Sequence, residues 1–145
     1  MFELRAARPD DAEAVSALAE VLGYTVSPAE CRERLARLSS SPDREVSVAE
    51  VEGRVRGWVE VARFESLTSP PSAQIVGLVV DPETRGLGLG RRLVEWSEAW
   101  ARGRGLSALR LRSRQHRVEA HAFYLHLGFE KTKEQSLFVR SLSPG

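Results

Sequence analysis

The sequence predicts a mixed α/β fold, and three observations support this prediction. Strand-like runs and amphipathic helical segments alternate along the chain. The apolar run at 73–80 is followed by a glycine-rich turn and a helical pattern, as in a strand–turn–helix unit. The 145 residues contain neither an internal repeat nor a long linker. We therefore expect one domain covering residues 1–145.

The N-terminal half predicts a strand, two helices and a hairpin. Residues 2–7 are strand-like, and RPDD after them opens a helix. SPAE at 27–30 predicts the start of a second helix, with serine as N-cap, proline at the first helical position and glutamate closing a capping box. Two strand-like runs, EVSVAEV and RVRGWVEVARF, flank Glu52-Gly53, which is a hairpin signal.

The C-terminal half predicts strands alternating with helices. LTSPPS at 67–72 predicts a loop, because proline cannot donate to a sheet. AQIVGLVV at 73–80 is apolar on both faces, which predicts a covered central strand. LSALRLRS and SLFVRSL, at 106–113 and 136–142, predict two further strands. The helical patterns between the strands rest on Leu89, Leu93, Trp96 and Trp100, ended by Gly103 and Gly105, and on Ala120, Phe123 and Leu127, ended by Gly128.

Charge and cysteine content exclude several classes of protein. The net charge is +1, so no bulk field recruits nucleic acid or a membrane surface, and we expect neither as a partner. The chain has one cysteine, Cys31, which excludes an internal disulfide and favours a reducing compartment. It lacks a signal-peptide pattern and any apolar run approaching the ~20 residues of a membrane span. We therefore expect a cytoplasmic protein.

The stretch TRGLGLGRRL at 84–93 carries the strongest functional signal. Gly86, Gly88 and Gly90 lie between an apolar strand and a helix start. The first N–H groups of a helix lack internal partners, and the helix dipole adds positive charge there. Glycine lets the oxygens of a phosphate approach such a backbone closely. The pattern therefore predicts a phosphate-binding turn.

Two familiar phosphate motifs fit this turn poorly. A P-loop requires a Lys-Ser/Thr pair after its second glycine, and the sequence has none here. In a dinucleotide fingerprint the third glycine would stand at Arg91, one residue beyond Gly90. The next strand carries Arg112 and Arg114 where an acidic residue is expected, which would suit a 2′-phosphate. From the residues alone, a small NADP-binding module stays the second interpretation.

VVDPETRGLGLGRRL at 79–93 resembles the acetyl-CoA signature of the GNAT superfamily of N-acetyltransferases, R/Q-x-x-G-x-G/A, matched by Arg85, Gly88 and Gly90. A second family element, A-x-x-F/L-Y-x-x-x-G-F, is matched by Ala120, Phe123, Tyr124, Gly128 and Phe129. The two motifs occur in the family's order, and the resemblance covers the whole chain. It implies a central twisted mixed sheet of about six or seven strands flanked by about four helices.

The resemblance also implies an activity: direct attack of a primary amine on the thioester of acetyl-CoA, with no metal. By the family pattern, Tyr124 meets the leaving sulfur and the Leu78 N–H polarises the thioester carbonyl. The residues expected to bind acetyl-CoA are Leu78, Val79, Val80, Arg85, Gly86, Leu87, Gly88, Leu89, Gly90, Arg91 and Tyr124. The acceptor is an amine on a small molecule or peptide, and a homodimer stays open. The alternative is a non-catalytic module that binds CoA or a partner.

The general base is the least defined part of the site. Gln74 stands where some relatives have a glutamate, and glutamine cannot take a proton. Glu60 and Glu65 are candidates, and we expect no single carboxylate to be indispensable. Trp58 alternates with Glu60 and could line an acceptor pocket or pack against a helix.

The histidines and the cysteine predict no metal site. His116, His121 and His126 recur at a spacing that does not stack on one helical face. Cys31 lies on an apolar helix face, which predicts core packing.

Overall fold

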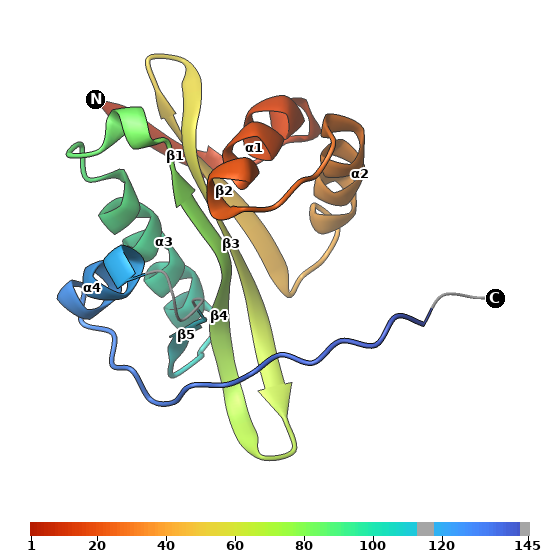
Figure 1. The fold of residues 1–145 in the computed structure, drawn as a ribbon, viewed down its shortest axis with the longest axis vertical. Coiled ribbons are helices and arrows are strands. Elements are labelled where there is room, and N and C mark those ends of the chain that lie inside the picture. The colour runs from red at the N-terminus through yellow and green to blue at the C-terminus, as the bar shows by residue number, and fades with distance from the viewer. Residues whose placement is uncertain (113–117, 143–145) are drawn as a thin grey trace. The chain divides into compact units, whose positions relative to one another are not determined.

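The computed structural model describes residues 1–112 and 118–142 of the chain (Figure 1). The chain forms two compact units, Met1–Arg112 and Ser113–Gly145. In chain order, the described residues form β1 (Phe2–Ala6), the 3-10 turn η1 (Pro9–Asp11), α1 (Ala12–Ala19), η2 (Glu20–Leu22), α2 (Pro28–Leu38), β2 (Arg44–Val51), β3 (Arg54–Ser66), β4 (Ser69–Val80), η3 (Pro82–Thr84), α3 (Leu89–Gly103), β5 (Leu109–Leu111) and α4 (Val118–His126).

The strands form one mixed sheet, as the sequence predicts. Among the described residues it has five strands in the order β1-β2-β3-β4-β5. Neighbouring strands from β1 to β4 are antiparallel, and β5 is parallel to β4. The parallel pair has α3 in its connection, as a crossover requires.

The prediction of a last strand at 136–142 is wrong, so the sheet has fewer strands than the resemblance implies. Within the described part of the chain this segment has no secondary structure, and the side chain of Phe138 is 91% exposed. Alternating apolar residues show that a segment is compatible with a sheet. They do not supply the neighbouring strand whose hydrogen bonds create one.

The prediction of a loop at 67–72 is also wrong, because β4 already begins at Ser69. Pro70 and Pro71 lie at an irregularity of the β3–β4 ladder, between the pairs Phe64–Ser72 and Ser66–Ser69, and β5 begins to pair only at Ala73. Proline is tolerated at a bulge and on a strand edge that has no neighbour, because no ladder hydrogen bond is lost there. The central strand therefore starts as an edge strand, which a local reading of the prolines cannot detect.

Two local signals are confirmed. In the hairpin turn between β2 and β3, Glu52 and Gly53 have φ of 51° and 78°, as a turn with two left-handed residues requires. At the start of α2, the Ser27 hydroxyl accepts a hydrogen bond from the Glu30 N–H at 3.1 Å. The Glu30 carboxylate accepts one from the Ser27 N–H at 3.1 Å, which completes the capping box.

Helices cover both faces of the sheet within the unit Met1–Arg112 (Figure 1). On one face, α1 and α2 pack against a core that includes Val48, Trp58 and Val79. On the other face lies α3, whose Leu89 and Leu93 are fully buried. Strand alternation explains the division, because odd and even positions of β3 point to opposite faces.

Candidate active site

Among the described residues, the last part of β4 pairs with a neighbouring strand on one edge alone, and its other edge is open. β5 pairs only with residues 73–75, although β4 continues to Val80. The Asp81 N–H donates to the Arg56 carbonyl oxygen at 2.7 Å, which fixes the phase of the antiparallel β3–β4 ladder. Two residues back, Val79 therefore bonds toward β3, while Leu78 and Val80 direct their N–H and C=O groups to the other edge. β5 pairs with this same edge at residues 73–75 and does not extend further along it.

A β-bulge in β4 lies directly before this section. Val61 pairs with Ile75 and Glu60 pairs with Gly77, so Val76 is an extra residue on β4. A bulge bends its strand and increases the local twist. The bulge therefore redirects the last part of β4 where the ladder with β5 ends, and Val76 is left 51% exposed.

The three glycines after β4 differ in backbone conformation. Gly86 and Gly88 have φ of 91° and 81°, a left-handed backbone that favours glycine. Gly90 lies in the first turn of α3, among helical residues. A Cβ added to Gly86 or Gly88 would meet nothing within 4 Å, so the turn presents bare backbone to open space. A phosphate group fits such a cradle.

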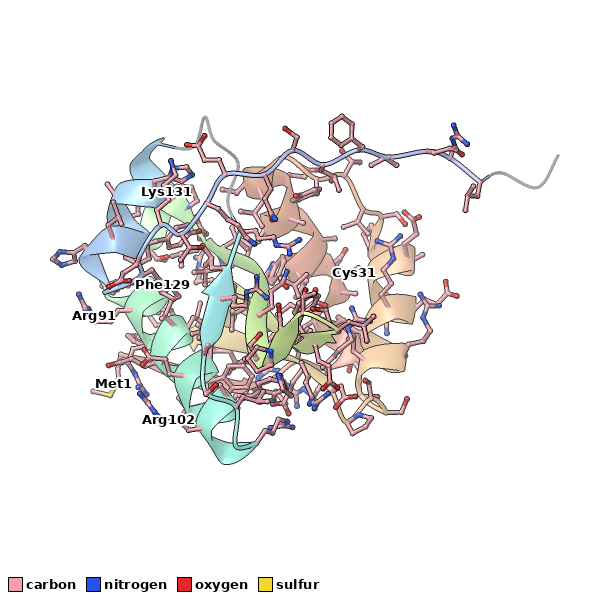
Figure 2. All side chains as sticks on the ribbon, turned by 90° about the horizontal axis from the view of Figure 1, so that it is seen from below. Met1, Cys31, Arg91, Arg102, Phe129 and Lys131 are labelled. Atoms are coloured by element: carbon pink, nitrogen blue, oxygen red, sulfur yellow. The ribbon has the colours of Figure 1, made fainter. Side chains whose placement is uncertain are left out.

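The first turn of α3 presents N–H groups toward this turn. The first helical bond runs from the Arg92 N–H to the Gly88 carbonyl at 3.1 Å, so the N–H groups of Leu89, Gly90 and Arg91 precede it. The N–H groups of Arg85 and Leu87 make long turn bonds of 3.4 Å, to the carbonyl oxygens of Pro82 and Thr84. The helix start carries about half a unit of positive charge. The exposed Arg91 extends from the same turn (Figure 2).

Asp81 stabilises the start of the turn through its carboxylate. This residue was not identified from the sequence. Its carboxylate accepts from the Glu83 N–H at 3.0 Å and from Nη1 of Arg56 at 2.8 Å. The hydrogen bond from the Glu83 N–H, followed by the contact with Arg56, lowers the pKa of Asp81 below its ordinary value. The Asp-Pro pair at 81–82 is a recognisable cap signal that could have identified it.

Tyr124 belongs to the unit Ser113–Gly145, on α4. It is half-buried, with its ring centroid 5.9 Å from that of Phe123 and 6.2 Å from that of Phe129. The Phe129 N–H donates to the Tyr124 carbonyl at 3.1 Å, and Gly128 has φ of 97°. This is a Schellman helix end, which explains why the motif requires glycine and an aromatic residue after the tyrosine. Phe129 is labelled in Figure 2.

The candidate bases lie in different surroundings. Glu60 is on β3 opposite Gly77, next to the bulge, and its carboxylate pairs with Arg44 at 2.6 Å. Glu65 lies at the exposed hairpin end of β3 and pairs with Arg63 at 3.0 Å. Gln74 is half-buried on β4, opposite Ala62.

Trp58 packs in the core of the described residues. Its side chain is buried with Val48 and Val79 against α1. Its indole N–H donates to the Val15 carbonyl at 3.1 Å. The packing interpretation is therefore correct.

Cys31 is buried on α2, in the core that it shares with α1 (Figure 2), as predicted. Burial raises the pKa of its thiol. Among residues 1–112 and 118–142, no three or more His, Cys, Asp or Glu side chains lie together so that they could hold a metal ion. Arg114 and His116 lie outside the described residues. No helix within the described part of the chain is long and apolar enough to cross a membrane.

The fold and the turn define the class of protein first. A mixed sheet whose fourth strand leads through a glycine turn into a helix is an α/β arrangement. The chain belongs to the acetyltransferase (GNAT) family, whose sequence profile matches residues 12–129.

Named relatives support this assignment. The aminoglycoside N(6')-acetyltransferase type 1 of Stenotrophomonas maltophilia is 31% identical over 97% of this chain and 94% of its own. The aminoalkylphosphonate N-acetyltransferase of Salmonella typhimurium is 30% identical over 90% of this chain and 86% of its own. A solved aminoglycoside N-acetyltransferase in complex with CoA shares the fold, with a TM-score of 0.85, 17% identity, and coverage of 99% of this chain and 96% of that chain. The chain is an N-acetyltransferase, an enzyme that transfers an acetyl group to an amine.

Proposed function

We propose that the donor is acetyl-CoA and the acceptor is the primary amine of a small molecule, which attacks the thioester directly. Residues 1–145 act as one acetyltransferase domain, and the family match at 12–129 supports this because it runs across both units. The reaction needs no metal. Its place is the cytoplasm, in keeping with the single free thiol of Cys31.

One observation carries the proposal: the opened edge of β4 leads directly into the glycine turn. Acetyl-CoA supplies an activated thioester on a long amide-bearing arm. Leu78 and Val80 offer N–H and C=O groups to that arm as a neighbouring strand would, with Val79 between them bonded toward β3. The Leu78 N–H then polarises the thioester carbonyl. Removal of one such donor costs about 2.7–4 kcal/mol of barrier in other acyl-transfer enzymes.

The turn binds the pyrophosphate in this proposal. The backbone of residues 85–91 surrounds the position, and the open space beside Gly86 and Gly88 admits the phosphate oxygens. The side chains of Arg85 and Arg91 are exposed on the same stretch and add positive charge. A cosubstrate anchored at the turn extends its arm along the edge of β4.

Tyr124 assists the leaving group. The thiol released from CoA has a pKa of about 8.5 and a phenol one of about 10, so the tyrosine stabilises the departing thiolate by a hydrogen bond rather than by complete proton transfer. Tyr124→Phe keeps the ring contacts with Phe123 and Phe129. We expect a kcat lower by about tenfold to a thousandfold, because acid assistance is worth roughly a hundredfold to ten-thousandfold.

Stopped-flow turnover, the dissociation constant of acetyl-CoA and the melting temperature together test this role. The dissociation constant and the melting temperature should stay near the wild-type values. A wild-type kcat, measured where chemistry limits the rate, would give Tyr124 a packing role only.

Release of free thiol from acetyl-CoA with a panel of amines tests the proposed function. The named relatives make an aminoglycoside and an aminoalkylphosphonate the first compounds to include, with a polyamine and an amino acid beside them. We expect release that depends on one class of primary amine and rises with pH as its ammonium, with a pKa of about 10 for an alkyl amine, loses its proton. Acetyl-CoA that binds without amine-dependent release from any compound would contradict the proposal.

A further inference from the structure

Glu60 lies on β3 one position after Val59, which is the residue directly opposite Leu78. Its partner across the β3–β4 ladder is Gly77, which lies between the bulge residue Val76 and Leu78. Residues directly opposite each other in an antiparallel pair have Cα atoms about 4.5–5.5 Å apart. The base of the Glu60 side chain is therefore one residue away from the N–H group that faces the thioester in the proposed function.

The alternation of β3 residues shows on which face of the sheet Glu60 lies. Gly57 lies on the face covered by α3, where a Cβ on Gly57 would be 3.3 Å from Cδ1 of Leu93. Glu60 lies on the opposite face, because positions of β3 alternate between faces and Trp58 faces α1. Glu60 is half-buried on that face and not sealed in the core, so a small molecule can reach its carboxylate.

The Glu60 carboxylate is held in place and keeps one oxygen available. Nη2 of Arg44 donates to Oε2 of Glu60 at 2.6 Å, a short charge-assisted bond. The side chain of Glu60 is 17% exposed and that of Arg44 is 51% exposed, so the carboxylate is mostly buried and the guanidinium faces solvent. The bond to Arg44 does not use Oε1. Gln74 lies on the same face, because its partner Ala62 is two positions from Glu60 on β3. The side chain of Gln74 carries no charge.

We propose that Oε1 of Glu60 binds the acceptor's amino group beside the Leu78 N–H, and that Arg44 is a positioning residue that fixes the Glu60 carboxylate. This rests on the proposed function. A carboxylate binds an arriving ammonium strongly, and it still accepts one N–H after the ammonium has given a proton to solvent water or hydroxide. The remaining lone pair is then free to face the thioester carbon. Glu60 thus selects cationic amines without having to be the base.

The first test compares Glu60→Gln with Glu45→Gln as a matched control. Glu45 lies on β2 opposite Val61, so its carboxylate belongs to the same sheet but to the face covered by α3. The assay uses neamine, 2-aminoethylphosphonate or spermidine, whichever gives the fastest thiol release with the wild-type enzyme. Glu60→Gln should lower kcat/KM for that amine by about tenfold to a hundredfold, because the neutral amide cannot make a charge-assisted hydrogen bond to the ammonium. Glu45→Gln should leave it unchanged.

The second test separates positioning from folding. Arg44→Gln should raise the acceptor KM by about threefold to tenfold with a smaller change in kcat, because the carboxylate stays but loses its orientation. Glu60→Asp should recover part of the loss if the variant chain is folded, as judged by its melting temperature. Acetyl-CoA affinity should match wild type in all variants.

Two results would overturn the proposal. One is a Glu60→Gln enzyme with wild-type kcat/KM for the amine. The other is a loss of acetyl-CoA affinity that accounts for the whole effect. A wild-type enzyme that releases no thiol with these three amines or with the amino acid of the panel would instead overturn the proposed function, and the Glu60 proposal with it.

Discussion

Two pairs of glycines occupy their positions for different physical reasons. Gly86 and Gly88, in the turn before α3, have left-handed backbones, and a Cβ on either would meet nothing within 4 Å. Gly57 and Gly77, in the sheet, do not have a left-handed conformation, but there is no space beside them for a Cβ. A Cβ on Gly57 would be 3.1 Å from the Val79 oxygen, and one on Gly77 would be 2.9 Å from the Trp58 ring. The turn needs glycine for its conformation, and the sheet needs it for close packing.

The difference separates binding from stability. The turn leaves room that the protein itself does not fill, so a change there should act on the ligand. Gly77 lets the Trp58 ring lie across β4 while the indole N–H donates to the Val15 carbonyl of α1, and Gly57 leaves room for Leu93 of α3. A change there should act on the folded state. Three substitutions test this division.

The largest expected effect is that of Gly88→Asp on acetyl-CoA binding. Its carboxylate would occupy the proposed pyrophosphate position and repel the phosphate charge, and Gly90→Asp should act in the same direction. We expect a loss of affinity beyond about a thousandfold, which corresponds to about 4 kcal/mol. Calorimetric titration with acetyl-CoA measures it.

Gly53→Asp is the matched control for Gly88→Asp. Gly53 also has a positive φ and an open Cβ direction, but it lies in the β2–β3 hairpin turn. The control should keep wild-type affinity at a similar cost in stability. Unchanged affinity in both Gly88→Asp and Gly90→Asp would remove the pyrophosphate from this turn.

An intermediate effect is expected for Gly77→Ala, and it concerns stability. The new Cβ overlaps the Trp58 ring, and overpacking of this kind costs about 1–3 kcal/mol. Chemical denaturation measures the loss in the free energy of unfolding. Gly103→Ala is the control, since a Cβ there meets nothing within 4 Å and alanine favours the helix.

A double-mutant cycle with Trp58→Phe identifies the cause of the Gly77→Ala effect. Removing the outer ring of the indole should make Gly77→Ala less costly, so that the two changes are not additive. Strict additivity would mean that the ring is not what keeps this position free of a side chain.

The smallest effect is expected for Gly86→Ala. The methyl group has space, but its left-handed backbone costs a non-glycine residue about 1–2 kcal/mol of folding stability. Gly53→Ala should cost a similar amount. Thermal unfolding compares the two, and titration with acetyl-CoA should show weaker binding for Gly86→Ala alone. Equal affinities would show that the left-handed position itself is not needed for binding.

Local signals in the sequence were sufficient for much of the fold. The capping box at Ser27, the hairpin at Glu52-Gly53 and the glycine end of α4 are each set by residues a few positions apart, and all three are present. The glycine turn before α3 is also a local feature, because it depends on backbone conformation within one short stretch. Such features need no knowledge of the rest of the chain.

Features that depend on distant partners could not be predicted. The prolines of β4 are tolerated because the β3–β4 ladder is irregular there and β5 starts later. SLFVRSL is not a strand because it lacks a ladder partner among the described residues. The packing of Trp58 depends on Gly77 and on the carbonyl of Val15. The opened edge at Leu78 follows from the short β5 and from the bulge, which only the register of β3 and β4 reveals.

The burial of Cys31 has a practical consequence for measurements on this enzyme. The chain contains one thiol, it is buried between α1 and α2, and its pKa is raised, so in the folded state it reacts slowly with disulfide reagents. A colorimetric thiol reagent added during turnover therefore reports the CoA thiol with little background from the protein. Once the core between α1 and α2 opens, each chain contributes one reactive thiol. The same reagent, added without acetyl-CoA, counts unfolded molecules and can separate a variant that has lost turnover from one that has lost its fold.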